Sequence, residues 1–374
     1  MIRSIGEKSN ASFQKISPFL LTQGKYIPAR FSLGINHWLG FNAPMPIEES
    51  EIAEHAETVK KLTSALNQVL FGQDELVDSV VTGLLARGHI LLEGLPGLGK
   101  TELVKGLAKT LDLENKRIQF TPDLLPGDIT GNPVLRETPE GREFVFQEGP
   151  IFANLVLADE INRASPKTQS ALLEAMQERR VTVLGDSHEL PDPFFVLATQ
   201  NPIELEGTYP LPEAQLDRFL FKLEVHRNPV ETLEQIVKNR EMGVEPTVEK
   251  VLTRDELASI TAAVREIYLP DVVASYIARI VDATHRGSSD AANYIKYGAS
   301  PRAALGLASA CKARALMDGR INTSFEDVAA VAIPVLQHRI ILEYEARIEG
   351  KNNRGVVEEL LEEVARQDLD LPAT

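Results

Sequence analysis

The sequence predicts an α/β fold, an αβα sandwich with a parallel sheet of five strands, followed by an all-helical region. Between residues 89 and 225, five short apolar runs alternate with helical patterns, which is typical of a parallel sheet covered by helices on both faces. After Asn228-Pro229 such runs stop, and apolar residues recur at helical spacing as far as residue 367.

The length and composition indicate a folded protein of more than one domain. The chain has 374 residues, of which 43% are hydrophobic and 25% are charged, a balance close to the average of globular proteins. Single domains usually have roughly 100–200 residues. We therefore expect an N-terminal extension over 1–47, a domain with the sheet over 48–228, and a helical domain with a C-terminal tail over 229–374.

The charge, the cysteine count and the hydropathy exclude several classes of protein. A formal charge of −15 argues against binding nucleic acid through a broadly cationic surface, although a local basic channel remains open. The single cysteine, Cys311, cannot form an intramolecular disulfide. No uncharged apolar stretch reaches the roughly 18 residues needed to span a bilayer. We expect a soluble, cytoplasmic protein.

The N-terminal extension, 1–47, differs from the rest of the chain. It carries five basic residues and one acidic residue, so its charge of +4 leaves −19 for the remainder. It has neither sustained periodicity nor the pattern of a signal peptide. We expect a poorly ordered extension or the product of an upstream start codon; a transit-like segment and a partner-binding arm are the alternatives.

The elements follow from the spacing of apolar residues and from the turns that bound them. Helices over 47–70 and 73–87 precede the first strand at 89–93, and a helix over 100–111 follows it. The other strands are expected at 117–120, 155–158, 194–199 and 220–225. The main helices of the C-terminal region are expected at 260–267, 272–284, 301–317 and 325–337.

Two segments interrupt the alternation of strands and helices. Segment 121–149 is rich in proline and glycine, and its Phe144-Val145-Phe146 alternates like an edge strand. In segment 181–193 a β-branched run meets the turn dipeptide Gly185-Asp186. We predict an inserted hairpin or loop in the first segment and a hairpin in the second.

A glycine-rich loop joins the first strand to the next helix. It matches the phosphate-binding pattern G-x-x-x-x-G-K-[ST] in the required context, with the sequence Gly94-Leu95-Pro96-Gly97-Leu98-Gly99-Lys100-Thr101. Backbone N–H groups and the helix N-terminus would surround phosphates, Lys100 would neutralise them, and Thr101 would ligate Mg²⁺. The predicted nucleotide-binding residues here are Gly94, Pro96, Gly97, Leu98, Gly99, Lys100, Thr101 and Glu102.

Two carboxylates follow the apolar run 155–158. By itself, an acidic pair at the end of a strand is more often a helix cap. After a phosphate loop it indicates a catalytic pair, because ligands of α/β sheets bind at the carboxyl ends of the strands. Asp159 would then hold Mg²⁺, and Glu160 would orient the water that attacks the γ-phosphate.

Three further polar residues are candidates for contact with the phosphates. Asn201 lies at the tip of the fourth strand, where its side chain can bond the attacking water or the γ-phosphate. Arg218 follows a short helix, and Arg302 begins a long one. Arginine is suited to binding phosphate charge, whereas an isolated arginine is more often a surface ion-pair partner.

The ordered set of these motifs resembles the AAA+ ATPase superfamily. The match covers roughly residues 50–345, and three segments resemble the MoxR family in particular: Glu160-Ile161-Asn162-Arg163-Ala164, Ala198-Thr199-Gln200-Asn201-Pro202 and Gly207-Thr208-Tyr209-Pro210-Leu211-Pro212-Glu213-Ala214. The resemblance implies a P-loop NTPase core, a C-terminal helical lid, and ATP hydrolysis at the subunit interfaces of a ring that is usually hexameric.

The same resemblance implies roles for individual residues. Asn201 would be sensor 1 and Arg302 sensor 2. Arg218 would be the arginine finger that reaches the neighbouring subunit, with Arg163 as the second choice. The adenine pocket would form around Phe71-Gly72-Gln73, with Gln73 among the residues that bind the nucleotide.

The predicted function is Mg²⁺-dependent ATP hydrolysis by a ring that remodels or activates a client protein. By resemblance, the client is a protein with a von Willebrand factor A-type domain or an enzyme that receives a metal cofactor. A DNA-remodelling, helicase-like motor is the alternative, which the acidic body disfavours. A nucleotide switch with little hydrolysis is a third hypothesis, disfavoured by the presence of Glu160 and Asn201.

Overall fold

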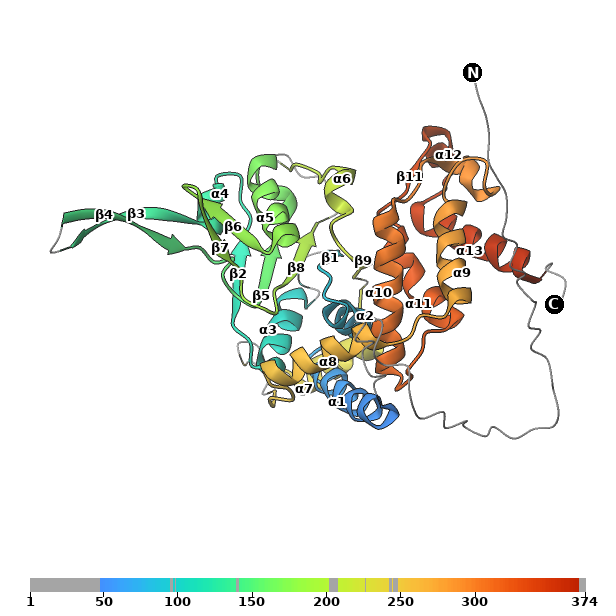
Figure 1. Ribbon diagram of the computed structural model, residues 1–374, viewed down its shortest axis with the longest axis horizontal. Coiled ribbons are helices and arrows are strands. Elements are labelled where there is room, and N and C mark those ends of the chain that lie inside the picture. The colour runs from blue at the N-terminus through green and yellow to red at the C-terminus, as the bar shows by residue number, and fades with distance from the viewer. Residues whose placement is uncertain are drawn as a thin grey trace, which may run out of the picture. The chain divides into compact units, whose positions relative to one another are not determined.

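The computed structural model describes residues 48–94, 97, 99–138, 141–201, 208–225, 227–241, 244 and 248–369 (Figure 1). The expectations for the extension 1–47 and for the loop residues Pro96 and Leu98 lie outside these described residues.

Five parallel strands form the central sheet, in the order β2-β5-β8-β1-β9. The strands are β1 (Ile90–Glu93), β2 (Asn115–Gln119), β5 (Leu155–Asp159), β8 (Phe195–Gln200) and β9 (Phe221–Glu224). The three inner strands are almost entirely buried, which is why their sequences are continuous apolar runs. The predicted five-stranded parallel sheet is confirmed.

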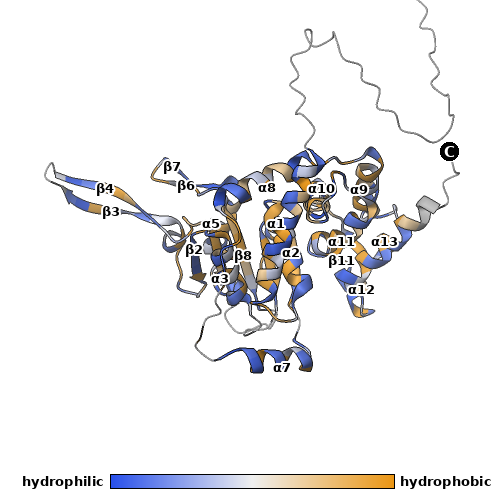
Figure 2. Ribbon diagram, turned by 90° about the horizontal axis from the view of Figure 1, so that it is seen from below, coloured by the Kyte–Doolittle hydropathy of each residue, from blue (hydrophilic) through white to orange (hydrophobic). Residues whose placement is uncertain are grey.

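Helices cover both faces of the sheet, as predicted for an αβα sandwich. Ile90 and Leu92 pack with α1 (Glu49–Asn67), α2 (Asp74–Leu85) and α3 (Lys100–Leu111). Leu91, with the opposite orientation, packs with α4 (Pro126–Thr130) and α5 (Pro166–Glu178). In Figure 2, β8 is largely apolar, as a buried strand requires, whereas α1 also carries the polar residues of its exposed face.

Each predicted insertion contains an antiparallel hairpin. The first pairs β3 (Gly131–Thr138) with β4 (Gly141–Glu148), and the second pairs β6 (Arg180–Val183) with β7 (Asp186–Glu189). The first hairpin extends away from the sheet (Figure 1). The Phe146 ring stacks on the His188 ring with centroids 4.0 Å apart, so the two hairpins contact each other. Phe144 is 70% exposed.

The described residues after β9 are mainly helical, with one short pairing of strands and an isolated bridge between Tyr268 and Asn322. The helices are α7 (Val230–Asn239), α8 (Arg254–Glu266), α9 (Asp271–Ala283), α10 (Pro301–Met317), α11 (Phe325–Leu336), α12 (Tyr344–Ile348) and α13 (Asn353–Leu369). The pairing joins β10 (Ile295–Tyr297) to β11 (Ile341–Leu342). The sequence did not predict it, because strands this short show no periodicity.

Side-chain caps set the starts of three of these helices. Thr253 and Ser324 form capping boxes with Glu256 and Asp327 at α8 and α11. The hydroxyl of Ser300 accepts the backbone N–H of Arg302 at the start of α10. Short helices α6 (Glu213–Leu216), η1 (Ile161–Arg163) and η2 (Ala291–Tyr294) complete the described fold. No helix within it has the length and apolarity to cross a membrane.

Candidate functional site

The loop between β1 and α3 depends on glycine at its turns. Gly97 and Gly99 have φ angles of +83° and +84°, a left-handed conformation that glycine adopts without strain. Lys100 begins α3 directly after this turn, and its Nζ atom donates to the carbonyl oxygen of Gly94. Burial lowers the pKa of Lys100, and the nearby carboxylates, Asp159 foremost, oppose that shift. The loop therefore holds a half-buried ammonium group close to carboxylates.

Thr199 connects the acidic pair to the neighbouring strand. Because β2 and β8 flank β5 in the sheet, side chains at their carboxyl ends reach Asp159 from both sides. The Thr199 hydroxyl donates to Asp159 Oδ1 over 2.6 Å and accepts the backbone N–H of Glu160 over 2.8 Å. Arg117 on β2 donates from Nη2 to Asp159 Oδ2 over 2.6 Å. Both carboxylate oxygens of Asp159 are thus fixed by adjacent strands.

The backbone turns sharply at Glu160. Its φ of +55° lies in the left-handed region, which is uncommon for a residue with a side chain and typical of functional turns. The Glu160 carboxylate accepts a hydrogen bond from Gln119 Nε2 at 3.2 Å and another from Arg163 Nη1 at 2.9 Å. Residues from β2 and η1 therefore orient this carboxylate.

These groups line one cavity of about 390 Å³ at the carboxyl ends of the parallel strands, the usual place for a ligand in an open α/β sheet. The predicted residues that it brings together are Gly94, Gly97, Gly99, Lys100, Thr101, Glu102, Asp159, Glu160 and Asn201. Arg117, Gln119 and Thr199 also line it and were not predicted.

A second pocket of about 260 Å³ adjoins the first, because Gly97, Gly99 and Glu102 line both. Its walls include Phe71 and Ile236, and Gln73 Nε2 donates to Asn228 Oδ1 over 2.6 Å at its edge. The guanidinium of Arg240 lies 5.3 Å from the centroid of the Phe71 ring. Of the residues predicted for adenine, Phe71 and Gln73 therefore line a pocket that adjoins the cavity, whereas Gly72 does not line it. Helix α7 contributes Ile236 to the walls.

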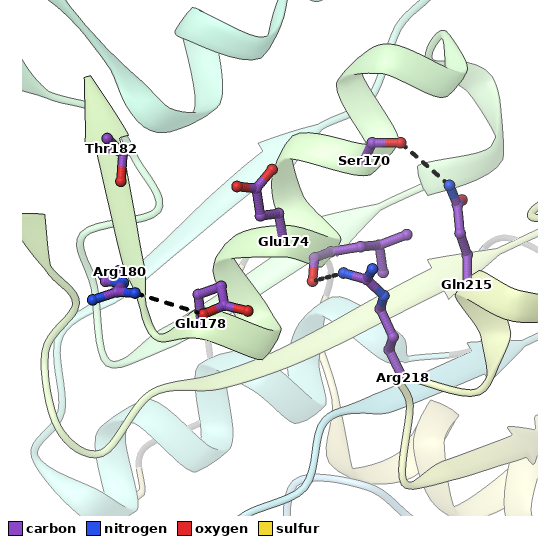
Figure 3. A pocket seen from close by; sticks show the side chains of 8 residues that line it. Ser170, Glu174, Glu178, Arg180, Thr182, Gln215 and Arg218 are labelled. Atoms are coloured by element: carbon purple, nitrogen blue, oxygen red, sulfur yellow. Dashed lines mark hydrogen bonds and ion pairs between the residues drawn. The ribbon is translucent and has the colours of Figure 1, made fainter. Parts of the chain in front are cut away.

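Arg218 lies at the opposite end of the sheet. It precedes β9, so it is at the amino ends of the strands, and the four residues of β9 separate it from the carboxyl ends by about 13 Å. Its Nη1 atom donates to the Leu173 carbonyl oxygen over 2.7 Å. It lines a pocket of about 430 Å³ (Figure 3) together with Ser170, Leu173, Glu174, Glu178, Arg180, Thr182 and Gln215.

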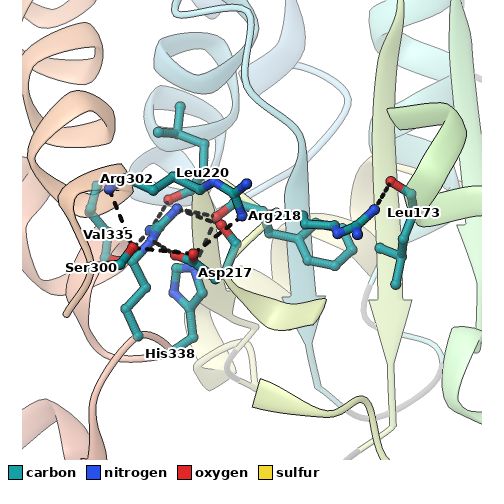
Figure 4. Close-up of polar contacts among 10 residues, drawn as sticks. Leu173, Asp217, Arg218, Leu220, Ser300, Arg302, Val335 and His338 are labelled. Atoms are coloured by element: carbon teal, nitrogen blue, oxygen red, sulfur yellow. Dashed lines mark hydrogen bonds and ion pairs between the residues drawn. The ribbon is translucent and has the colours of Figure 1, made fainter. Parts of the chain in front are cut away.

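Arg302 is held beside Arg218 and not at the cavity. Its Nη1 atom lies 3.2 Å from Asp217 Oδ2, and the Ser300 hydroxyl donates to the same oxygen over 3.3 Å (Figure 4). Neither arginine is among the described residues that line the cavity with Lys100. Arg163, the second choice for an arginine finger, contacts Glu160 of its own chain.

Sequence reasoning missed the partners of the acidic pair. Arg117 and Gln119 alternate with the buried Ile118 on β2, so both point to the same face of the sheet. That alternation, at the carboxyl end of a predicted strand, is a signal that could have found them. The alternation does not reveal the order of the strands in the sheet, and it is this order that places β2 beside β5.

The strand order, the glycine loop before a helix and the helical region that follows define the class of protein, an AAA-type ATPase fold with a lid. Residues 89–221 match the model of the ATPase family associated with various cellular activities (AAA). Residues 287–360 match the model of the AAA lid domain.

Comparisons with individual proteins identify the family. Chaperone MoxR1 of Mycobacterium tuberculosis is 42% identical over 320 residues, which cover 84% of this chain and 84% of that protein. Protein MoxR of Paracoccus denitrificans is 30% identical over 325 residues, 81% of this chain and 94% of that one. A crystal structure of a Cytophaga hutchinsonii protein assigned as an ATPase has a TM-score of 0.77 at 41% identity, covering 84% of this chain and 96% of that one. The chain belongs to the MoxR family of AAA+ ATPases.

Proposed function

We propose that this chain hydrolyses ATP with Mg²⁺ in a ring, hexameric as the family resemblance implies, and that hydrolysis remodels or activates a client protein. The observation that carries the proposal is the cavity in which Lys100, Asp159 and Glu160 converge from separate segments. A relative named as a chaperone, similar over most of the chain, supports action on another protein.

The two adjoining pockets suit the two ends of one nucleotide. The phosphates would occupy the larger cavity, where loop N–H groups, the N-terminus of α3 and the ammonium group of Lys100 supply positive charge. The base would occupy the smaller pocket, with Phe71 and Ile236 as apolar contacts and the Gln73–Asn228 pair as hydrogen-bonding groups.

Thr101 and Asp159 suit a magnesium ion. A hydroxyl and a carboxylate on one cavity wall are the hard oxygen donors that Mg²⁺ prefers. An ion held by these two protein oxygens would complete its coordination with water and phosphate oxygens, which Mg²⁺ usually keeps. Bound there, Mg²⁺ would neutralise charge on the β- and γ-phosphates.

Glu160 and Asn201 would act on the attacking water. The backbone turn at Glu160 and its bonds from Gln119 and Arg163 hold the carboxylate at the cavity, where it would orient and polarise the water. Asn201 follows β8 and lines the same cavity, so its side chain would bond the water or the γ-phosphate. Such positioning is the main contribution of a protein to phosphoryl transfer.

Arg218 would serve the ATP of the neighbouring subunit. Its place at the amino ends of the strands, about 13 Å of strand away from the carboxyl ends, supports action between subunits and therefore a ring. Its guanidinium would bind charge that develops on the γ-phosphate. Arg302, which contacts Asp217 next to Arg218, would act at the same interface.

The variant Glu160→Gln tests this function. We expect ATP binding to change by less than about threefold while turnover falls at least about 100-fold, and the assembled ring to persist with ATP. Glu114→Gln is a matched control, because Glu114 precedes β2 at the other end of the sheet and pairs with Lys116 at 3.1 Å. Near-normal turnover of Glu160→Gln would refute the assigned role.

The same variant can trap the client. Proteins retained by ATP-bound Glu160→Gln and released from Lys100→Ala would be clients, and we expect von Willebrand factor A-type proteins or metal-dependent enzymes among them. Retention of DNA in their place, with affinity that falls steeply with salt, would favour the DNA-remodelling motor.

A further inference from the structure

One buried arginine of the lid holds the chain segment that carries Arg218. The Arg339 side chain follows α11 and is only 3% exposed. Its Nη2 atom donates to the carbonyl oxygens of Asp217 and Phe219, at 3.2 and 2.7 Å, and Nη1 donates to that of Leu220 at 3.0 Å. Nε donates to Asp217 Oδ1 at 2.8 Å. One guanidinium therefore binds backbone groups on both sides of Arg218.

The lid makes several other bonds to the same segment. The Asp217 carboxylate, which Arg339 contacts through Oδ1, accepts from Arg302 and Ser300 through Oδ2. His338 Nε2 lies 2.9 Å from the Phe219 carbonyl oxygen. Downstream, Gln337 Nε2 donates to a carbonyl oxygen of β9. The lid thus binds the carbonyl and carboxylate oxygens that flank Arg218.

The segment is also anchored on its sheet side. Phe219 is completely buried in the core below α5, and the backbone N–H of Leu220 donates to the His89 carbonyl oxygen over 2.7 Å. The Arg218 side chain points away from the lid and toward α5, as Figure 4 shows. Its direction is therefore set by neighbours that are bound to the lid and to the sheet together.

We propose that Arg339 and Asp217 form a clamp through which the helical lid positions Arg218, so that movement of the lid is transmitted to the arginine that serves the next subunit. The inference rests on the proposed function, in which Arg218 acts between subunits. Arg339 is a positioning residue, since it contacts the segment and does not line the described cavity.

The variant Arg339→Lys tests the clamp with the charge retained. A lysine has no planar fork and cannot bind the carboxylate and three carbonyl groups together. We expect turnover to fall about 10- to 100-fold, because a small displacement of a reacting group has effects of that size, with ATP affinity unchanged. If Arg339→Lys does not fold, Asp217→Asn is the second variant, and we expect the same fall in turnover with ATP affinity unchanged.

Mixed assemblies distinguish loss of positioning from general damage. Arg339→Lys mixed with Lys100→Ala should recover activity, because the second subunit supplies a well-placed Arg218 to an intact cavity. Arg339→Lys mixed with Arg218→Ala should not recover, because neither subunit supplies one. Recovery of activity in both mixtures, or in neither, would overturn the proposal that Arg339 positions Arg218.

A reference mixture separates this outcome from failure of the proposed function. Arg218→Ala with Lys100→Ala must recover activity if Arg218 acts between subunits, and absence of recovery would refute that role and the clamp with it. Arg320→Lys is the matched control, because this lid arginine donates to the buried Asp327 at 2.8 Å away from the segment. We expect its turnover to stay within about twofold of the wild type.

Discussion

The two ends of the central sheet bear charged residues that are stabilised in different ways. At the carboxyl ends, the charged groups contact each other: Arg117 binds Asp159, and Arg163 binds Glu160. At the amino ends, the Arg218 guanidinium is bound to a carbonyl oxygen, and its backbone neighbours are bound by Arg339 of the lid. One end is a cavity lined by a single chain, whereas the other holds a half-buried guanidinium against α5, on a segment that the lid binds.

This difference is the basis of the proposal that the cavity of one subunit is completed by an arginine of its neighbour. The cavity contains the groups expected to bind phosphates and water, but the arginines expected to bind transition-state charge lie on the far side of β9 or beside Asp217. With the phosphate cavity at one end of the sheet and the arginines at the other, hydrolysis would require assembly of subunits. Substitutions at each end should therefore have different effects on ATP affinity and on turnover.

The largest effects should come from removing one cation at each end. Lys100→Ala should lose at least about tenfold in ATP affinity together with turnover, since its ammonium group binds the phosphates. Arg218→Ala should lose at least about 100-fold in turnover with ATP affinity within about threefold, measured by titration with a fluorescent nucleotide. If Arg218→Ala lost as much ATP affinity as Lys100→Ala, the assignment of nucleotide binding to the carboxyl ends of the strands alone would be wrong.

Acid should lower the free energy of unfolding through protonation of His89, which lies at the amino ends of the sheet strands. Its imidazole contacts the Met176 carbonyl oxygen of α5 and accepts the Val196 N–H of β8, and burial lowers its pKa from 6.5 to about 4. The unfolded chain therefore binds the proton first, so stability is full above pH 6.5 and declines as the pH falls toward 4. The expected loss is about 3 kcal/mol.

Urea unfolding at pH 7.5 and at pH 4.5 measures this effect. His89→Gln, which keeps hydrogen-bonding groups, should show less pH dependence than the wild type, and the exposed His285→Gln should behave like the wild type. Equal pH dependence in all three proteins would show that His89 does not stabilise the amino end in this way.

Arg163→Ala should have an intermediate effect, of about tenfold on turnover, because Arg163 orients Glu160 of its own chain. The mixing pattern should be the reverse of that for Arg218. Arg163→Ala with Arg218→Ala should recover activity, and Arg163→Ala with Lys100→Ala should not. The opposite pattern would make Arg163 the residue that acts between subunits.

The smallest effects should come from the first hairpin, which belongs to neither end. Phe144 is exposed, so Phe144→Ala should change the free energy of unfolding by less than about 0.5 kcal/mol. Phe146→Ala removes ring contacts with His188 and Phe152 and should cost about 1 kcal/mol. Both variants should keep basal ATP turnover; a large loss in Phe144→Ala would connect the hairpin to the cavity.

Local patterns predicted much of the cavity. The glycine loop, Lys100 and Thr101 are contiguous with the strand and helix that position them, so the spacing alone placed them together. The acidic pair was predictable because a buried strand ends directly before it. Thr199 and Arg117 were not, because their contacts cross between strands that are far apart in the chain, and no local pattern gives the order of strands.

By itself, the sequence determined that an apolar five-stranded sheet would form, that helices would cover it, and that a phosphate loop and two carboxylates would follow its strands. These features depend on burial and on turns within a few residues. Only the tertiary structure decided that Arg218 would lie at the opposite end of the sheet from Lys100, and that Arg339, 121 positions further along the chain than Arg218, would bind the backbone on either side of it. The reason is that a buried guanidinium must find acceptors for its donors, and only the packed lid determines which acceptors are within reach.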